Sequence, residues 1–204
     1  MSLYALKPKF QSLLRPLVSK LFVMGVTANQ VTVVAAVVSV ALGVWLSIDP
    51  RSDLFLLIPL WMFLRMAFNA IDGMLAREFG QKSALGAYLN ELTDVISDAC
   101  LYLPFAFLLH FTPLWVGVFI ALSIVVEMTG VVGLMVGASR RYDGPFGKSD
   151  RAFAIGALAL AIGLGLPPQD WLAWMFPAMS VLIVLTIVRR VREGLNENNA
   201  GAAK

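Results

Sequence analysis

Long apolar stretches alternate with short polar stretches along most of the chain. Four stretches are largely apolar for close to the roughly 20 residues that a helix needs to cross a bilayer: 28–48, 54–71, 113–138 and 171–188. Segment 83–111 is polar in its first half, and segment 152–166 is apolar but short. Polar residues are tolerated in a membrane helix that lines a wet cavity. The pattern therefore predicts an all-α integral membrane protein with six transmembrane helices.

The N-terminal residues have a different periodicity. Leucine and phenylalanine recur at helical spacing over residues 1–25, with Lys9, Ser12 and Lys20 off the apolar stripe. This pattern predicts either an amphipathic helix in the membrane plane or a helix that packs on the bundle without touching lipid. We expect residues 1–192 to form a single domain, with the six-helix bundle at 27–192. The polar tail, 193–204, is expected to fray.

Composition and charge support this architecture. The chain is 59% hydrophobic and 14% charged, whereas soluble domains average about 45–50% apolar and about 25% charged residues. A single cysteine, Cys100, excludes a disulfide framework and a CxxC metal site. The six-span arrangement places every Lys and Arg except Arg51 and Arg65 on one face, which is then the cytoplasmic face. Both termini would be cytoplasmic, in a multi-pass protein of the cell's inner (cytoplasmic) membrane.

Polar residues form a stripe on each of two consecutive predicted spans. The second span carries Arg65, Asn69, Asp72 and Ala76 on one face, and the third carries Gly86, Asn90, Asp94 and Asp98, with Glu91 on the flank. The connection at 77–82 is short, so the two helices should be antiparallel neighbours, with Asp72 near Asp94.

Facing carboxylates in a low-dielectric environment require a neutralising cation. Oxygen ligands from Asp, Asn and Glu suit Mg²⁺ or Mn²⁺. The alternative is a buried Arg65–Asp72 ion pair, with the other carboxylates hydrogen-bonded to neighbouring helices.

The spacing of these residues resembles a known signature. The run Asp72-Gly73-x2-Ala76-Arg77-x8-Gly86-x3-Asn90-x3-Asp94 is similar to D-x2-D-G-x2-A-R-x8-G-x3-D-x3-D, the signature of the CDP-alcohol phosphotransferase family. The resemblance covers residues 27–192. It implies a CDP-linked donor and metal between the second and third spans, with an alcohol that attacks the β-phosphorus and expels CMP.

The resemblance also implies roles for individual residues. Asp72 and Asp94 would hold metal, Asp94 would accept the alcohol proton, and Arg77 would offset developing charge. The nucleotide pocket would consist of Gly73, Ala76 and Arg77, with Gly86 leaving room for a close helix contact. Asn29 and Thr32 look like part of a Pro-Asn-x-x-Thr motif, although Ala28 replaces the proline. Their alternative role is a helix N-cap.

Asn69 and Asn90 depart from the signature, because the family has aspartates at both positions. The site then loses two of four negative ligands. A single metal could bind, or Glu91 and Asp98 could substitute for the missing carboxylates. We predict a displaced site that uses Asp72, Asp94 and at least one of Glu91 and Asp98. An inactive relative is the third alternative.

Cations cluster around the connection between the fourth and fifth spans. Arg140, Arg141, Lys148 and Arg151 are candidates to bind the headgroup of an acceptor alcohol, which in relatives is often phosphorylated. Their alternative role is to set topology by contacting anionic lipid. Glu127, midway along the fourth span, should face a cavity or a partner helix.

These features predict a metal-dependent phospholipid-synthesis transferase that uses a CDP-linked donor, with CDP-diacylglycerol favoured. A small transporter is the competing class, but no repeated halves are visible. The small-residue ridge Gly133-x3-Gly137 suggests close helix contacts, either within the bundle or in a homodimer. We expect membrane lipids and a second copy of the chain as partners, and no nucleic acid.

Overall fold

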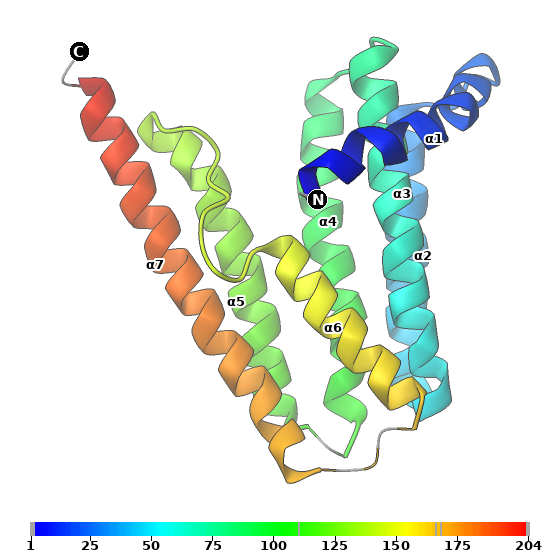
Figure 1. The fold of residues 1–204 in the computed structure, drawn as a ribbon, viewed down its shortest axis with the longest axis vertical. Coiled ribbons are helices and arrows are strands. Elements are labelled where there is room, and N and C mark those ends of the chain that lie inside the picture. The colour runs from blue at the N-terminus through cyan, green and yellow to red at the C-terminus, as the bar shows by residue number, and fades with distance from the viewer. Residues whose placement is uncertain (1–2, 110, 166, 168, 203–204) are drawn as a thin grey trace. The chain divides into compact units, whose positions relative to one another are not determined.

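The protein is built from helices joined by turns and loops, and the part of the chain that the structure describes contains no strand (Figure 1). The structure is a computed structural model and describes residues 3–109, 111–165, 167 and 169–202. Its contacts divide the chain into two compact units. Unit 1 comprises Met1–Ala41 and Leu60–Ser97, and unit 2 comprises Leu42–Pro59 and Asp98–Lys204. The all-α prediction is confirmed.

Unit 1 is built from α1 (Leu3–Val23) and from most of α2 (Ala28–Ile48), α3 (Leu57–Glu78) and α4 (Ala84–Tyr102). Its core consists of small and branched apolar side chains from α1, α2 and α3: Val18, Ala28, Val31, Ile71, Met74 and Leu75. Trp61 of α3 donates from Nε1 to Ser39 Oγ of α2 at 2.8 Å. In a bilayer, close van der Waals packing of these side chains and interhelical hydrogen bonds such as this one hold the helices together.

Helix α1 packs on this unit. Val18 is fully buried, and Arg15 forms an ion pair of 3.0 Å with Glu78 at the end of α3. Leu13 nevertheless keeps 75% of its surface exposed, and Leu17 is also exposed. The helix therefore docks on the bundle through one face and presents leucines outward on another.

Helices α3 and α4 are antiparallel neighbours within unit 1, as the short connection predicted (Figure 1). Both helices begin close to the predicted spans, but α3 continues past Asp72 to Glu78, and α4 ends at Tyr102, nine residues before the predicted end at Phe111. The signature residues 72–77 therefore lie on the last turns of a continuous helix, which fixes the direction of their side chains.

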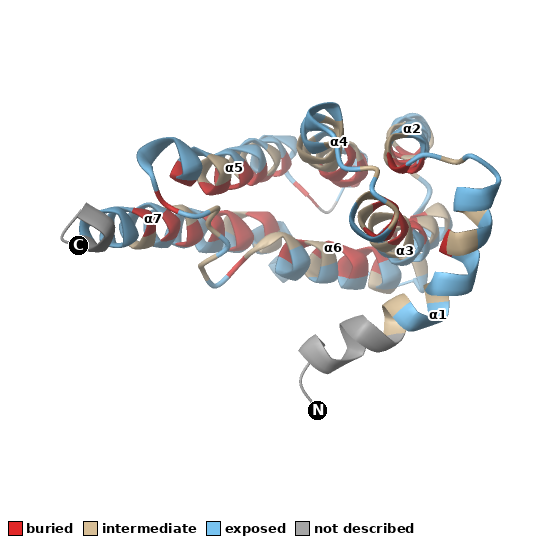
Figure 2. Ribbon diagram, turned by 90° about the horizontal axis from the view of Figure 1, so that it is seen from above, coloured by how far each residue is buried: buried red, intermediate tan, exposed pale blue. Residues whose placement is uncertain are grey.

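Unit 2 contains α5 (Pro113–Val132), α6 (Lys148–Gly163) and α7 (Met175–Ala202). It also contains four short 3-10 helices, η1 (Ser52–Leu56), η2 (Leu103–Phe107), η3 (Gly133–Val136) and η4 (Asp170–Trp174), in its described part. Helices α5 and α7 lie side by side, and Figure 2 shows buried positions on their facing sides. Phe176 contacts Phe105, Phe111 and Phe119 with ring centroids 5.1–5.7 Å apart. This aromatic cluster forms the apolar core of the unit.

The glycine ridge of η3 serves internal packing. A methyl group on Gly133 would lie 3.0 Å from the backbone oxygen of Ser139. Gly137 has a φ of 80°, which a glycine adopts without the strain that a side chain would cause. The homodimer remains a prediction that this ridge does not support.

Four helical segments are long and apolar enough to cross a membrane: Ala28–Ile48, Ser52–Glu78, Pro113–Val136 and Asp170–Asn199. They coincide with the four continuous apolar stretches, so a multi-pass membrane protein is confirmed. Helices α4 and α6 occupy the two remaining predicted segments. Six spans and cytoplasmic termini stay predictions.

The prediction of a frayed tail from residue 193 is wrong, because α7 runs without a break to Ala202. Glu197 accepts hydrogen bonds from the backbone N and Oγ of Ser139, at 3.0 and 2.9 Å, and pairs with Arg141. These contacts anchor a segment whose composition alone indicated disorder. Residues 203–204 lie outside the described part of the chain.

Candidate functional site

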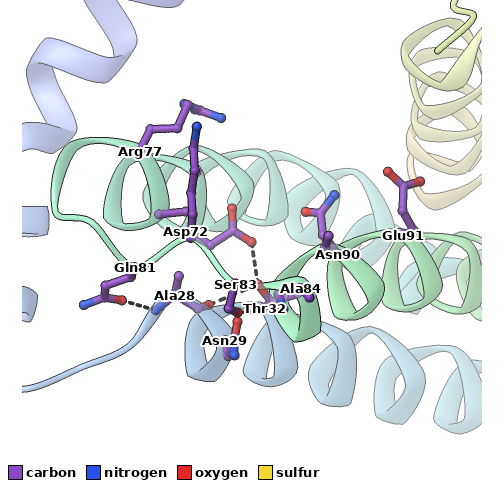
Figure 3. A pocket seen from close by; sticks show the side chains of 15 residues that line it. Ala28, Asn29, Thr32, Asp72, Arg77, Gln81, Ser83, Ala84, Asn90 and Glu91 are labelled. Atoms are coloured by element: carbon purple, nitrogen blue, oxygen red, sulfur yellow. Dashed lines mark hydrogen bonds between the residues drawn. The ribbon is translucent and has the colours of Figure 1, made fainter. Parts of the chain in front are cut away.

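A polar cavity of about 660 Å³ lies in unit 1. Figure 3 shows residues from α2, α3, α4 and the α3–α4 connection around it. The cavity is lined by Ala28, Asn29, Thr32, Asp72, Gly73, Ala76, Arg77, Gln81, Lys82, Ser83, Ala84, Gly86, Ala87, Asn90 and Glu91. The structure thus gathers most of the residues that the signature singled out, from Asn29 to Asn90.

Asp72 is the buried carboxylate of this cavity. Its Oδ2 accepts a hydrogen bond from Thr32 Oγ1 at 2.7 Å, drawn as a dashed line in Figure 3. The bond fixes the orientation of the carboxylate and uses a neutral donor, so the negative charge remains to be balanced.

Asn29 and Thr32 do not cap α2. The backbone N–H of Gln30 donates to Thr27 Oγ1 at 3.2 Å, and the backbone N–H of Thr27 donates to Gln30 Oε1 at 2.9 Å. This reciprocal pair is a capping box. The N-cap alternative for Asn29 and Thr32 is therefore wrong, and both residues line the cavity instead.

Two glycines make room for polar side chains at the cavity wall. A methyl group on Gly86 would lie 2.9 Å from Asn29 Oδ1 and 3.0 Å from Ser83 Oγ. A methyl group on Gly73 would lie 2.7 Å from Arg77 Nη2. The missing side chains let α4 approach α2 and let the Arg77 guanidinium fold back over its own helix.

Sequence reasoning missed Gln81 and Ser83. Gln81 Oε1 accepts a hydrogen bond from the backbone N of Ala28 at 2.7 Å, and Ser83 Oγ accepts one from the backbone N of Gly86 at 2.9 Å. Both residues lie in the connection between α3 and α4, where no helical periodicity marks a functional face. Their role is to hold the N-terminal ends of α2 and α4 at the cavity.

Arg65 pairs with Asp94 and not with Asp72. Its Nη2 donates to Asp94 Oδ1 at 2.8 Å and to the backbone oxygen of the same residue at 3.1 Å. Asp94 is half-buried and does not belong to the cavity lining. The alternative predicted a buried ion pair of Arg65 with Asp72. A buried ion pair does form, but the partner of Arg65 is Asp94.

The remaining predicted ligands are distributed over the two units. Asn90 and Glu91 line the cavity, Asn69 is half-buried on α3 outside it, and Asp98 is a buried residue of unit 2. Within the described residues, no group of three or more His, Cys, Asp or Glu side chains is arranged to hold a metal ion. The Asp72 carboxylate, the Asn90 amide and the Glu91 carboxylate are nevertheless hard oxygen donors of one cavity, a set that fits one Mg²⁺ or Mn²⁺.

Two of the predicted acceptor cations, Arg140 and Arg151, lie with Arg190 around a buried carboxylate in unit 2. Glu127 Oε1 accepts from Arg151 Nη2 at 2.7 Å and lies 3.6 Å from Arg190 Nη1, while its Oε2 lies 3.9 Å from Arg140 Nη2. Arg151 has no exposed surface, so the alternative of contact with anionic lipid is wrong for this residue. Glu127 faces this polar cluster, one of the two environments predicted for it.

The other cations of this region are also engaged. Arg141 pairs with Asp143 at 2.8 Å and with Glu197, and Lys148 is the first residue of α6. Sequence reasoning counted Arg190 only as a topology charge, yet it is 2% exposed. Thr186, one turn earlier on α7, accepts a hydrogen bond from the backbone N of Phe146 at 3.0 Å. The available signal was the spacing of Thr186 and Arg190, which lie four positions apart on one face of α7.

A multi-pass helical protein whose polar cavity displays an aspartate-glycine-alanine-arginine motif belongs to a specific class of membrane transferase. The family model for CDP-alcohol phosphatidyltransferases matches residues 25–190. The chain belongs to this family, which confirms the resemblance stated from the signature. It is a transferase of phosphorus-containing groups that acts in phospholipid biosynthesis.

Curated relatives cover most of the chain. The inner membrane protein YnbA of Escherichia coli is 44% identical over 96% of this chain and 97% of its own length. The archaetidylinositol phosphate synthase of Aeropyrum pernix is 32% identical over 74% of this chain and 73% of its own length.

Solved structures share the fold. Phosphatidylinositol phosphate synthase of Mycobacterium tuberculosis with CDP-DAG bound has a TM-score of 0.74 at 21% identity, over 88% of this chain and 92% of that chain. The same synthase in complex with manganese and citrate also has a TM-score of 0.74, over 88% of both chains.

Proposed function

We propose that the protein transfers a phosphatidyl group from CDP-diacylglycerol to a hydroxyl group of a polar alcohol and releases CMP. The observation that carries this proposal is the cavity of unit 1, which gathers the signature residues Asp72, Gly73, Ala76, Arg77, Gly86 and Asn90. The fold shared with a synthase solved with CDP-DAG bound supports a CDP-linked lipid as donor. The predicted charge distribution supports a cavity that opens on the cytoplasmic side.

The reaction balances as a displacement at phosphorus. The alcohol oxygen forms a bond to the β-phosphorus, and the bridging oxygen leaves with CMP and its electron pair. Asp94 is the proposed base that accepts the alcohol proton, and Arg77 offsets the charge that develops on the diphosphate. Gly73 and Ala76 leave the cavity wall flat enough for the nucleotide.

A divalent metal ion is part of the proposal, because the family is divalent-metal dependent. Asp72, Asn90 and Glu91 are the proposed protein ligands, and Mg²⁺ or Mn²⁺ suits their oxygen atoms. When bound, the ion would neutralise charge on the diphosphate and orient it. The earlier suggestion that Asp98 also contributes remains a proposal.

The acceptor headgroup is proposed to bind the cations of unit 2, Arg140, Arg141, Lys148 and Arg151. Arg190 joins this proposal because its Nη1 lies 3.6 Å from Glu127. The name of the Aeropyrum pernix relative, an archaetidylinositol phosphate synthase, supports a polyol or its phosphate as acceptor. Carboxylates already contact several of these cations, so an anionic headgroup competes with Glu127 and Asp143 for them.

The test uses the purified full-length protein in detergent with labelled CDP-diacylglycerol, Mg²⁺ or Mn²⁺ and a panel of alcohols. We expect CMP release and one new labelled lipid with a single class of acceptor. Asp53→Asn is the matched control for Asp72→Asn, because Asp53 is an exposed carboxylate paired with Arg51 away from the cavity. If no alcohol causes CMP release with either Mg²⁺ or Mn²⁺, the proposal is overturned. That result would favour the alternative that the protein is an inactive relative of the family.

A further inference from the structure

We propose that the Arg65 guanidinium supplies a permanent positive charge at the metal site. Unit 1 then holds one divalent ion, where the family signature provides carboxylates for two. Arg65 is here a positioning residue, which acts through Asp94. The inference rests on the proposed metal-dependent function.

The Arg65 side chain is held in a rigid arrangement. It lies on α3 one turn before Asn69 and is 6% exposed. One nitrogen, Nη2, contacts both the Asp94 carboxylate and the Asp94 backbone oxygen, at 2.8 and 3.1 Å. A buried guanidinium needs such partners, because an unpaired charge in a low-dielectric environment is strongly unfavourable. The contact fixes the Asp94 side chain in one orientation.

The charge balance of the stripe argues for one ion. Four signature carboxylates would balance two dications, but Asn69 and Asn90 are neutral. Asp72 and Asp94 remain, and the Arg65 guanidinium cancels one of their charges. Glu91 is already a proposed ligand of the ion at Asp72, and Asp98 is a buried residue of unit 2. A second dication near Asp94 would therefore face the Arg65 guanidinium.

The two aspartates also differ in their surroundings. Asp72 accepts from a neutral hydroxyl, Thr32 Oγ1, and lines the cavity beside Asn90. Asp94 accepts from a guanidinium and lies outside the lining. The geometry assigns the ion to Asp72 and its neighbours, and leaves Asp94 oriented by Arg65 for proton transfer.

The test counts bound Mn²⁺. Full-length protein in detergent is titrated with Mn²⁺ alone, and free Mn²⁺ is measured by electron paramagnetic resonance. We expect one ion per chain for the natural protein and for Arg65→Lys, which keeps the charge. The triple variant Arg65→Met, Asn69→Asp, Asn90→Asp restores the signature carboxylates and should bind two. Arg65→Met alone should bind Mn²⁺ about tenfold more tightly, since a repelling charge near the ion is removed.

Arg15→Met is the matched control, because Arg15 forms an exposed ion pair in the same unit and lies outside the cavity. It should leave both the number and the affinity of bound ions unchanged. Two Mn²⁺ ions in the natural protein would overturn the inference and leave the transfer reaction intact. No bound ion would overturn the inference together with the proposed metal ligands. Should Arg65→Met fail to fold, the natural protein and Arg65→Lys still decide the number of ions.

Discussion

Both units contain a buried ion-pair cluster, and the two clusters have opposite charge balance. In unit 1 the Arg65 guanidinium reduces the negative charge of a stripe that carries Asp72 and Asp94. In unit 2 the Glu127 carboxylate reduces the positive charge of three arginines. Each cluster therefore contains a residue whose charge has the same sign as the charge of the proposed ligand. The comparison indicates that the protein meets part of the electrostatic requirement of each site internally.

The largest expected effect concerns Asp72. Asp72→Asn should lower the rate of CMP release about 100-fold or more, because several kcal/mol of charge stabilisation depend on the metal ion that we propose Asp72 holds. The rate is measured in detergent with saturating donor and acceptor, and the thermal unfolding temperature shows that the variant folds. Asp53→Asn should turn over at the natural rate. Equal rates for Asp72→Asn and the natural protein would remove Asp72 from the metal site.

The next effect concerns the carboxylate of unit 2. Glu127→Gln leaves Arg151 and Arg190 buried without their anionic partner. Breaking a buried pair in this way costs about 3–5 kcal/mol, so the unfolding transition should move to markedly lower temperature or denaturant concentration. Glu197→Gln, on an exposed pair with Arg141, is the control and should cost far less. Equal losses would show that Glu127 is not the central anion of the cluster.

A smaller effect is expected on the KM for the acceptor alone. Arg140 is the most exposed of the three arginines around Glu127, with 27% of its side chain accessible. If it binds an acceptor headgroup, Arg140→Gln should raise the acceptor KM about tenfold and leave the donor KM nearly unchanged. Arg51→Gln provides the control for loss of a surface cation. A parallel rise in both KM values would instead indicate a general electrostatic role.

The smallest effect concerns the cavity wall. Gly86→Ala places a methyl group 2.9 Å from Asn29 Oδ1, so the Asn29 side chain must turn away. We expect the donor KM to rise a few fold, although alanine favours the helix by about 1 kcal/mol over glycine. Gly117→Ala on α5, which meets no atom within 4 Å, should stabilise without changing KM. Unchanged donor KM for Gly86→Ala would exclude Asn29 from donor binding.

The helices and the composition of the cavity could be predicted because they depend on local pattern. The apolar stretches, the i, i+4 stripes and the short connection after Arg77 determine which residues of α3 and α4 face each other. The signature residues Asp72, Gly73 and Asn90 consequently lie in one cavity, as expected from their spacing.

The partners of the charged residues could not be predicted in the same way. Periodicity places Arg65, Asp72 and Asp94 on facing stripes, but the rotation of α3 against α4 decides that Arg65 reaches Asp94. The three arginines around Glu127 come from α7, α6 and the connection before α6, and no spacing links them. The helical structure of residues 193–202 could not be predicted for the same reason. Glu197 binds Ser139, which lies 58 positions earlier in the sequence.

The uninterrupted α7 has a geometric consequence for the membrane surface. Its 28 residues span roughly 42 Å, which exceeds the hydrocarbon thickness of about 30 Å. The last turns are therefore expected to extend past the hydrocarbon core into the headgroup region, with which the bilayer is about 40–45 Å thick. Glu197 in these turns binds Ser139 and Arg141, so we expect this contact to hold the segment that carries the proposed acceptor cations near the lipid headgroups. A fluorophore attached near residue 198 would report the depth of this part of α7, through quenching by labels placed at known depths in the bilayer.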